Sequence, residues 1–242
     1  MNGTSSFSWL WQWPEWIPTL LPGLGVALLL MLIGCAVGYT CGFLLALLTE
    51  SRFAPAKWMA VVVVEVGRGI PILVLLYLIY QGLPQAGVLI DAFPSACIAF
   101  TWSAAAYSAE ILRGAIVAVP RGQFDAAAAL SLNPISTYAS IILPQAARIA
   151  IPPLVTLTIT MFHATSLASV ITVTEIMQIA HQQGAMKFNY MAVFTAAGII
   201  YLVIAVPAAI FADRLSKRFG GASAGRRSVV GRSSQVAELA SV

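Results

Sequence analysis

Two charged side chains lie within an apolar stretch of the sequence. Glu65 and Arg68 fall inside the run Trp58–Tyr80. An ionisable group within a bilayer is costly, and it usually marks a solute pathway or an ion pair. The two residues are three positions apart and share one face of a helix. We therefore predict that Arg68 attracts a solute carboxylate while Glu65 holds it in place; a purely structural Glu65–Arg68 pair is the alternative.

The residues beside this pair favour a broken helix. Gly67, Gly69 and Pro71 all weaken a helix. A hydrophobic segment interrupted near the middle of a membrane is a pointer to a transport site. The break would lie beside Arg68.

The run Ile149–Ile171 carries many polar side chains. Two stripes follow it at 100° per residue, Thr156, Thr160 and His163 on one side and Thr158, Thr165 and Ser169 roughly opposite. We predict that His163, Thr165 and Ser169 line the pathway together with Arg68. Both stripes cannot face one cavity in a straight helix, so Thr165 and Ser169 are the weaker candidates. Hydroxyl bonds to the helix backbone and a structural histidine are the alternatives.

A second charged pair, Glu110 and Arg113, lies near the end of the run Phe93–Val117. The spacing again places both side chains on one helix face. We expect a structural pair at the membrane boundary, with a gate contact as the alternative.

The composition explains which elements must position these residues. Hydrophobic residues make up 60% of the 242 residues and charged residues 9%, whereas a soluble domain carries about 25% charged residues. A spanning helix needs about 20 apolar residues. Five runs satisfy this: Leu20–Leu48, Trp58–Tyr80, Phe93–Val117, Ile149–Ile171 and Tyr190–Phe211. The predicted fold is an all-α integral membrane protein with about five transmembrane helices.

The basic residues predict how these helices are oriented. With five spans, all of the 13 Lys and Arg residues except Lys187 and Arg68 fall on one side. The positive-inside rule assigns that side to the cytoplasm. The N-terminus is therefore predicted outside and the C-terminus inside, as an odd number of spans requires.

The chain divides into three predicted parts. Residues 1–16 form an outer interfacial aromatic segment with Trp9, Trp11, Trp13 and Trp16. Residues 17–215 form the transmembrane domain, and residues 216–242 a disordered cytoplasmic tail rich in Ser, Gly and Arg. The three cysteines show no disulfide or metal spacing. Without paired carboxylates or a nucleophile–base pair, we expect no catalytic residues and no metal site.

The connection between the third and fourth runs, about residues 118–148, is too long for a simple helical turn. Gly122–Leu130 favours a short helix with Asp125 in its first turn, where a carboxylate suits the helix dipole. Asn133 and Pro134 then provide an N-cap and first residue for a second helix ending near Pro144. The small alanines 126–129 would let another protein approach closely.

This loop resembles the cytoplasmic "EAA" loop of bacterial ABC-importer permeases, which reads Glu-Ala-Ala, three residues, Gly, nine residues, Ile-x-Leu-Pro. The matching residues are Asp125, Ala126, Ala127, Ser131, Ile141, Leu143 and Pro144. Asp125 replaces Glu and Ser131 replaces Gly. If the backbone at position 131 is left-handed, serine costs about 1 kcal/mol there.

Further segments resemble the polar amino acid branch of that family, which includes histidine-, glutamine- and arginine-type uptake systems. They are Glu65–Pro71, Ala106–Gly114, Val119–Gln123, Leu143–Ala146 and Thr165–Ile171. Two departures lie where the family's solute pocket is expected. His163-Ala164 replaces the usual Lys-Asp, and Ser103-Ala104-Ala105 replaces Asn-Ser-Gly. The missing carboxylate at position 164 argues weakly against a strongly cationic solute.

The resemblance implies a permease subunit that moves a polar amino acid or related small solute through a bacterial inner membrane. It also implies a second permease subunit, ATPase subunits that use ATP and Mg²⁺, and an extracytoplasmic solute-binding protein. Because this chain has no Walker A pattern, ATP hydrolysis is expected on a separate chain and no cofactor on this one. The loop becomes a cytoplasmic coupling helix that contacts the ATPase. The competing hypothesis is a secondary transporter driven by an ion gradient, which needs no such loop.

The stretch from Glu175 to Asn189 resembles the family's periplasmic segment. A gate, a docking surface for the binding protein and a plain connection remain open there. The solute and the homo- or heterodimeric state also remain open.

Overall fold

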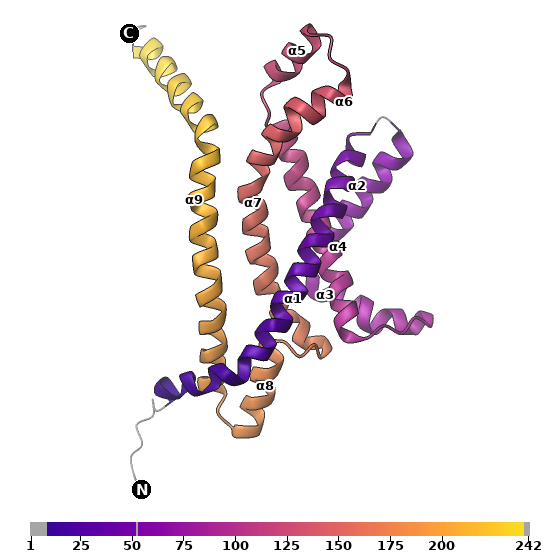
Figure 1. The fold of residues 1–242 in the computed structure, drawn as a ribbon, viewed down its shortest axis with the longest axis vertical. Coiled ribbons are helices and arrows are strands. Elements are labelled where there is room, and N and C mark those ends of the chain that lie inside the picture. Colours follow the sequence, from indigo (N-terminus) through magenta and orange to yellow (C-terminus); the bar gives the residue numbers. More distant parts are fainter. Residues whose placement is uncertain (1–8, 52, 240–242) are drawn as a thin grey trace.

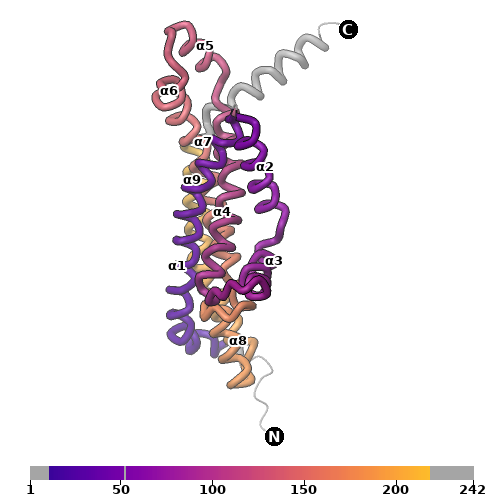
Figure 2. The backbone as a smooth tube through the Cα atoms, turned by 90° about the vertical axis from the view of Figure 1, so that its right-hand side faces the viewer, coloured from indigo at the N-terminus to yellow at the C-terminus, as the bar shows by residue number. Residues whose placement is uncertain are grey.

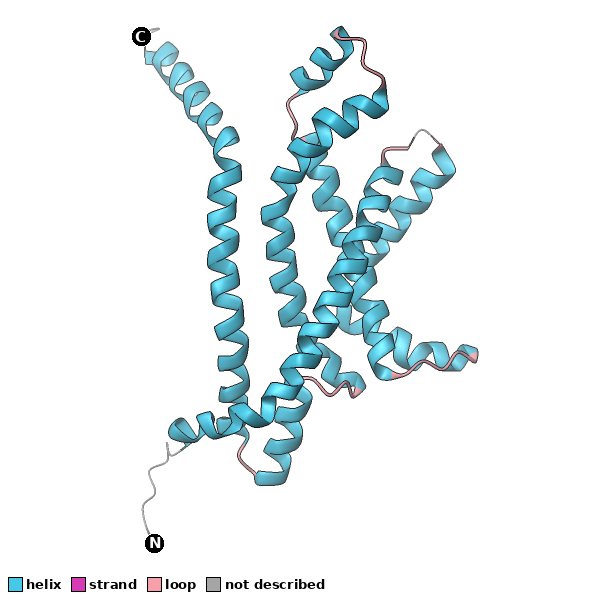
Figure 3. Cartoon of the chain, in the orientation of Figure 1, coloured by secondary structure: helices cyan, strands magenta, loops and turns pink. Residues whose placement is uncertain are grey.

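The protein is described by a computed structural model covering residues 9–51 and 53–239, with side chains for residues 11–51 and 53–218. Every regular element in these residues is a helix (Figure 3), which agrees with the predicted all-α class. The helices form an elongated assembly with two distinct ends (Figures 1 and 2). The first turns of α1 (Trp9–Thr49) and helix α8 (Ile176–Lys187) lie at one end. Helices α5 (Arg121–Ala129) and α6 (Pro134–Thr137) lie at the other.

Helix α4 (Ala92–Val117) lies at the centre and packs against α1, α2 and α7. Its buried residues are mostly small: Ser95, Ala96, Ala99, Phe100, Ser103, Ala104, Ala105, Ala106, Ser108, Ala109, Ala115 and Ile116. Small side chains let neighbouring backbones approach closely, and dispersion contacts then replace the hydrophobic drive that lipid does not supply.

Helix α1 presents a matching row of glycines to α4. Gly34, Gly38 and Gly42 are four residues apart and lie on one face of α1. A Cβ built on Gly38 would lie 2.6 Å from the Cβ of Ala104, and one on Gly34 would lie 2.9 Å from the Cβ of Phe100. The signal for this contact in the sequence is the Gly-x-x-x-Gly-x-x-x-Gly pattern of small residues.

The predicted break in the second apolar run is confirmed. Helix α2 (Ala54–Gly69) ends just before Pro71, and α3 (Ile72–Tyr77) begins just after it. Ile70 is extended, as is favoured for a residue that precedes proline. The bend is 103° between Ala54–Gly69 and Ile72–Ala86, so the second half extends sideways from the bundle and does not continue along it (Figure 1). A π-helical segment, Leu78–Gly82, and a 3₁₀ turn, Leu83–Ala86, complete that half.

Three helical stretches of the described residues are long and apolar enough to cross a membrane: Trp11–Thr49, Pro134–Ile171 and Tyr190–Arg218. The bent pair of α2 and α3 adds a fourth if it counts as one span. Helix α4 occupies the predicted third span but does not meet this criterion. Its Ala- and Ser-rich surface packs against other helices, so it needs fewer strongly apolar side chains. The five-span count and its orientation stay predictions.

The predicted coupling loop continues into the predicted fourth span without interruption. Asn133 caps α6 by accepting a hydrogen bond from the Ser136 N–H at 2.8 Å, as predicted. The predicted end of this helix near Pro144 is wrong, because a π-helical segment, Tyr138–Ile142, leads directly into α7 (Leu143–Ala164). A π-bulge shifts the hydrogen-bond pattern of the helix backbone, so the helix can continue through Pro144 although proline has no N–H to donate.

The ends of the chain extend beyond the predicted spans. Residues 1–8 of the predicted aromatic segment 1–16 lie outside the described residues, and Pro14, Pro18 and Pro22 follow within α1. Helix α9 (Tyr190–Leu239) has a helical backbone through most of the segment 216–242 for which the sequence predicts disorder. Disorder of that segment stays a prediction, because Gly- and Ser-rich sequences have low helix propensity.

Candidate functional site

Arg68 lies at the last turn of α2, directly before the bend. Its Nη1 lies 3.4 Å from Glu65 Oε1, so the predicted pair is present. The same Nη1 lies 4.0 Å from Glu110 Oε2 on α4. The Arg68 side chain is about one-third exposed and Glu65 about two-thirds exposed. Arg68 is therefore shared by two carboxylates from two helices.

Glu110 also binds Arg113 on its own helix. Arg113 Nε donates to Glu110 Oε2 at 3.0 Å, and Arg113 Nη2 donates to Glu110 Oε1 at 2.6 Å. This bidentate geometry is the favoured one for a guanidinium and a carboxylate. The expected structural pair at the end of α4 is present. Together the four side chains form a row of alternating charge across α2 and α4, which we call the α2–α4 charge row: Glu65, Arg68, Glu110 and Arg113.

The last turns of α2 are fixed against α4 through the backbone. The Trp102 indole N–H donates to the Val63 carbonyl at 3.2 Å, and the Tyr107 hydroxyl donates to the Arg68 carbonyl at 3.4 Å. A Cβ on Gly67 would lie 2.7 Å from the Ala106 Cβ. These contacts explain why two charge pairs that are far apart in sequence meet. The sequence predicts each pair separately, but it contains no direct sign of the α2–α4 contact.

His163 lies in a different place, on the exposed side of α7. It lines a groove of about 630 Å³ between α7 and α9, with Thr156, Thr160 and Asp213 among the other lining residues. The predicted stripe of Thr156, Thr160 and His163 therefore shares one surface. No described contact joins this groove to the α2–α4 charge row, so the structure does not bring Arg68 and His163 together.

The second polar stripe points into the protein. Thr158 and Tyr39 of α1 form a hydroxyl–hydroxyl hydrogen bond of 2.8 Å. Thr165 is fully buried and donates to the Phe162 carbonyl at 2.7 Å. Ser169 is partly buried and donates to the Ser166 carbonyl at 2.7 Å. The hydroxyls thus bond to their own backbone, as the alternative hypothesis held.

The helical register also changes along this stripe. Thr165–Ile171 is a 3₁₀ segment, in which residues advance by about 120° each and not 100°. Extrapolating an α-helix past Ala164 therefore misplaces Ser169. The segment ends at Thr172, which has a left-handed φ of 67°.

The predicted coupling loop is a projecting pair of short helices (Figure 1). Helix α5 begins at Arg121, so Asp125 lies in its second turn and not in the first as predicted. Asp125 and Ala126 are exposed, whereas Ala127 is 1% exposed. The Ala127 methyl packs within its own chain, so it cannot be the direct contact with another protein that the sequence suggested. Exposed Leu130 and Ile135 extend the apolar surface of the loop.

Ser131 ends α5 in a left-handed conformation, with φ of 54°. The Leu132 N–H donates to the Ala127 carbonyl at 3.1 Å and the Ser131 N–H to the Ala128 carbonyl at 2.9 Å. This pair of bonds is the Schellman motif, which glycine usually terminates. The spacing of the loop motif therefore located a real backbone requirement.

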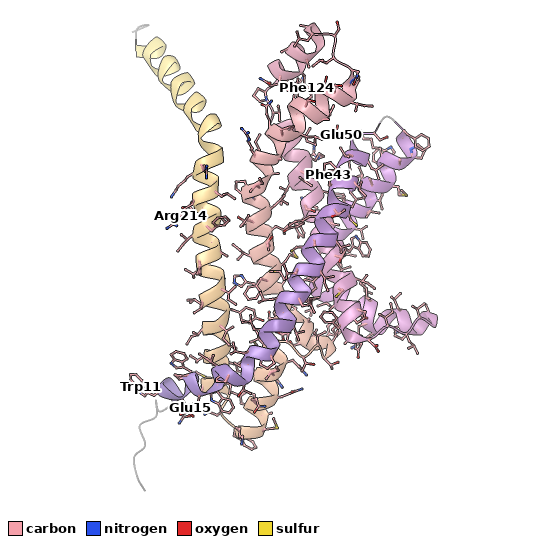
Figure 4. The ribbon with its side chains drawn as sticks, viewed as in Figure 1. Trp11, Glu15, Phe43, Glu50, Phe124 and Arg214 are labelled. Atoms are coloured by element: carbon pink, nitrogen blue, oxygen red, sulfur yellow. The ribbon has the colours of Figure 1, made fainter. Side chains whose placement is uncertain are left out.

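Side chains brace the loop against α7. Gln145 Nε2 donates to Gln123 Oε1 at 3.1 Å, and the rings of Phe124 and Tyr138 form an edge-to-face pair with centroids 6.2 Å apart. Leu143 is partly buried beneath the loop and Pro144 is exposed. Phe124 lies near Glu50, at the end of the molecule opposite Trp11 and Glu15 (Figure 4). The loop is therefore a braced projection that movement of α7 would carry with it.

The described residues contain no cluster of three or more His, Cys, Asp or Glu side chains arranged to hold a metal ion.

Comparisons with known proteins assign the family. The chain matches the binding-protein-dependent transport system inner membrane component family over residues 38–221. The probable amino-acid ABC transporter permease protein YckA of Bacillus subtilis (strain 168) is 38% identical, over 85% of this chain and 91% of the relative. The arginine transport system permease protein ArtQ of the same organism is 35% identical, over 78% and 86% respectively.

Solved structures agree with this assignment. A structure described as an amino acid ABC transporter with histidines has a TM-score of 0.81 at 31% identity, over 84% of this chain and 95% of that chain. An inward-facing methionine ABC transporter shares the fold, with a TM-score of 0.64 at 19% identity. These findings favour an ABC importer over an ion-driven secondary transporter. The chain belongs to the inner-membrane permease subunits of binding-protein-dependent ABC transporters.

Proposed function

We propose that this permease imports a polar amino acid or a related small solute into the cytoplasm. The observation that carries the proposal is the combination of high coverage and identity with amino-acid permeases. The relatives named for arginine, L-cystine and glutamate/aspartate are each 34–36% identical to this chain. Because these named solutes differ in charge, the comparison supports the amino-acid class and not one amino acid.

The proposed topology has five spans, with the N-terminus outside and the C-terminus in the cytoplasm. The distribution of basic residues supports it. The coupling loop and the start of α1 lie at opposite ends of the molecule (Figures 1 and 4), as this topology requires. The proposed location is a bacterial inner membrane.

The proposed partners are ATPase subunits, a second permease subunit and an extracytoplasmic solute-binding protein. The ATPase subunits, and not this chain, use ATP and Mg²⁺. The coupling loop presents exposed alanine, leucine and isoleucine side chains on a braced projection. Such a surface suits close docking to another protein. Asp125, Ala126, Ser131, Leu143 and Pro144 are the proposed coupling residues, with Ala127 packing beneath them.

Arg68 remains the proposed carboxylate contact of the pathway. Its guanidinium is partly exposed beside the helix break, and Glu65 and Glu110 orient it. His163 is the proposed contact for a solute side chain in the groove between α7 and α9. Thr165 and Ser169 stay proposed pathway residues, with their hydroxyls donating to the backbone carbonyls of Phe162 and Ser166.

Uptake by the complete transporter in proteoliposomes, with its binding protein and a panel of labelled amino acids, tests the proposal. Arg68→Gln should abolish uptake while the ATPase still co-purifies with the permease. His163→Ala should change the relative uptake of different amino acids more than the yield of the complex. A wild-type complex that hydrolyses ATP but accumulates no amino acid from the panel would contradict the proposed solute class.

A further inference from the structure

Glu175 is the only acidic side chain that is fully buried among the residues whose side chains the structure describes. It lies between the 3₁₀ segment Thr165–Ile171 and helix α8. Burying a carboxyl group is costly unless hydrogen bonds satisfy it. Neither the proposed pathway nor the coupling loop accounts for this residue.

The Glu175 carboxyl group is satisfied by three donors from two helices. Its Oε1 accepts from the Gln178 N–H at 2.9 Å, and its Oε2 accepts from the Met177 N–H at 2.9 Å, so the side chain caps α8. The Tyr201 hydroxyl of α9 also donates to Oε2, at 3.0 Å. Glu175 therefore connects α8 to α9.

A third helix confines the same position. A Cβ built on Gly23 of α1 would lie 2.7 Å from the carbonyl carbon of Glu175. The α1 backbone thus closes directly over the start of α8, and this close approach confines the backbone of Glu175. No lysine or arginine of the described residues lies within the 4.0 Å ion-pair distance of it.

Tyr201 links Glu175 to two proposed pathway residues, His163 near the end of α7 and Thr165 just after α7. Its ring centroid lies 5.2 Å from that of Phe162 and 6.4 Å from that of His163. Its hydroxyl also faces the Thr165 hydroxyl. The order of contacts runs from Glu175 to Tyr201 and then to Thr165 and His163.

The protonation state of Glu175 determines the direction of these hydrogen bonds. As a carboxylate, Oε2 can only accept, so the Tyr201 O–H donates to it. When Oε2 takes up a proton, it donates to Tyr201 Oη, and the Tyr201 proton turns toward Thr165. Burial raises the pKa of Glu175 to about 7, against the lowering effect of its N–H and Tyr201 donors. The titratable group that faces the Glu175 carboxyl is Tyr201, and His163 lies behind the Tyr201 ring. Helix α1 contributes only the backbone of Gly23 to this contact.

We propose that Glu175 is a positioning residue of the transport pathway, which acts through Tyr201 to set the placement of Thr165 and His163. This inference rests on the proposed import function. It differs from a purely structural role, because protonation of Glu175 should change solute affinity as well as stability.

Uptake measured against pH in proteoliposomes of the complete transporter tests the inference. In the wild type, the half-saturating solute concentration should change by about threefold or more between about pH 6 and pH 8. Glu175→Gln and Tyr201→Phe should remove most of this change. Glu15→Gln, an exposed carboxylate at the same end (Figure 4), should behave as the wild type. A Glu175→Gln transporter that keeps the wild-type pH profile would overturn the inference.

A second measurement separates this inference from the proposed function. Infrared absorption of the purified complex should show a protonated carboxyl band that titrates near neutral pH and is absent in Glu175→Gln. In Tyr201→Phe the band should shift, because its hydrogen-bond partner is gone. If uptake fails for every amino acid while the band behaves in this way, the solute class is wrong but the Glu175–Tyr201 link holds. If no such band exists, the link itself is refuted.

Discussion

Ser131 shows how one residue can carry a cost that the fold tolerates. Its φ of 54° lies in the left-handed region, where a residue with a Cβ is disfavoured by about 1–2 kcal/mol. The Schellman bonds of α5 require this conformation, because both carbonyl acceptors lie in the last turn. The loop between α5 and α6 therefore forms with a serine where glycine would be unstrained.

We predict that Ser131→Gly stabilises the permease, by about 1 kcal/mol. Thermal unfolding of the purified protein, followed by the loss of monodisperse material, would measure the gain. Ser140→Gly is the matched control, since Ser140 is exposed and helical. It should destabilise by up to about 1 kcal/mol. A gain from both substitutions, or from neither, would show that backbone strain at position 131 is not the cause.

Glu175 predicts a specific pH dependence of stability. Its pKa is about 7 in the folded protein against an ordinary value of 4.5. The folded state thus binds this proton more tightly than the unfolded state does. The stabilisation that results, ~3 kcal/mol in total, is fully present below about pH 4.5 and is lost as the pH rises through about 7. The difference in unfolding midpoint between wild type and Glu175→Gln should shrink or change sign along that range. A difference that is constant with pH would contradict the raised pKa.

The residue scale also shows which part of the site the sequence can reveal. Glu65 with Arg68 and Glu110 with Arg113 are local pairs, and their three-residue spacing predicts them. The link between Arg68 and Glu110 depends on which helices are neighbours, and that information is not local. Burial of Ala127 among exposed alanines likewise depends on how α5 folds back on the chain.

Among the described elements, the contact between α1 and α4 is the most extensive. It depends on the absence of side chains at Gly34, Gly38 and Gly42, whose Cβ positions are occupied by α4 atoms. Lipid competes equally well for large apolar side chains, so close backbone packing is what favours this contact.

We predict that Gly38→Leu prevents α1 from packing on α4. A leucine side chain would overlap the Ala104 Cβ and the Thr101 carbonyl. Less permease should be recovered as a monodisperse species, which fluorescence-detected size-exclusion chromatography measures. Gly25→Leu on the same helix is the control, because no atom lies within 4 Å of the Cβ position there. Equal losses in both variants would mean that α1 insertion, and not the α4 contact, is affected.

The coupling loop predicts a defect in assembly that leaves the fold intact. Ala128 is exposed on α5, and arginine is a good helix former. Ala128→Arg should therefore keep the loop folded while its long charged side chain blocks close docking. Less ATPase should co-purify with this variant than with the wild type. Gln85→Arg, an exposed residue outside the loop, should retain the ATPase, and normal co-purification of Ala128→Arg would exclude this face as the docking surface.

Helix ends explain most of the remaining differences at the element scale. Composition and periodicity predict the helices themselves, and the Pro71 break follows from a local rule. The continuous passage through Pro144 does not, because a π-bulge accommodates the proline there. The 3₁₀ segment after Ala164 changes the register in the same way, so side-chain directions beyond it could not be extrapolated.

At the scale of the whole molecule, the difference between its two ends is the feature that relates the proposed sites to the function. The α5–α6 projection and the α8 end face opposite ways (Figure 1). The α2–α4 charge row and the His163 groove lie on separate helices between them. An importer must couple a cytoplasmic event to such intermediate sites, and α7 is continuous with the loop at one end and with the 3₁₀ segment near Glu175 at the other. Helix α7 thus runs from the α5–α6 projection to the 3₁₀ segment that precedes Glu175.

The proposed orientation of the chain in the membrane can be tested at two exposed residues. Phe53 follows α1 and Phe188 follows α8, and both are well exposed. Three proposed spans separate them, so they should lie on opposite sides of the membrane, with Phe53 in the cytoplasm. In a background with Cys35, Cys41 and Cys97 replaced, Phe188→Cys should react with a membrane-impermeant maleimide in intact spheroplasts. Phe53→Cys should react only after the membrane is opened. Labelling of both from outside would require an even number of crossings between them, and the bent pair of α2 and α3 would then be a re-entrant hairpin and not a span.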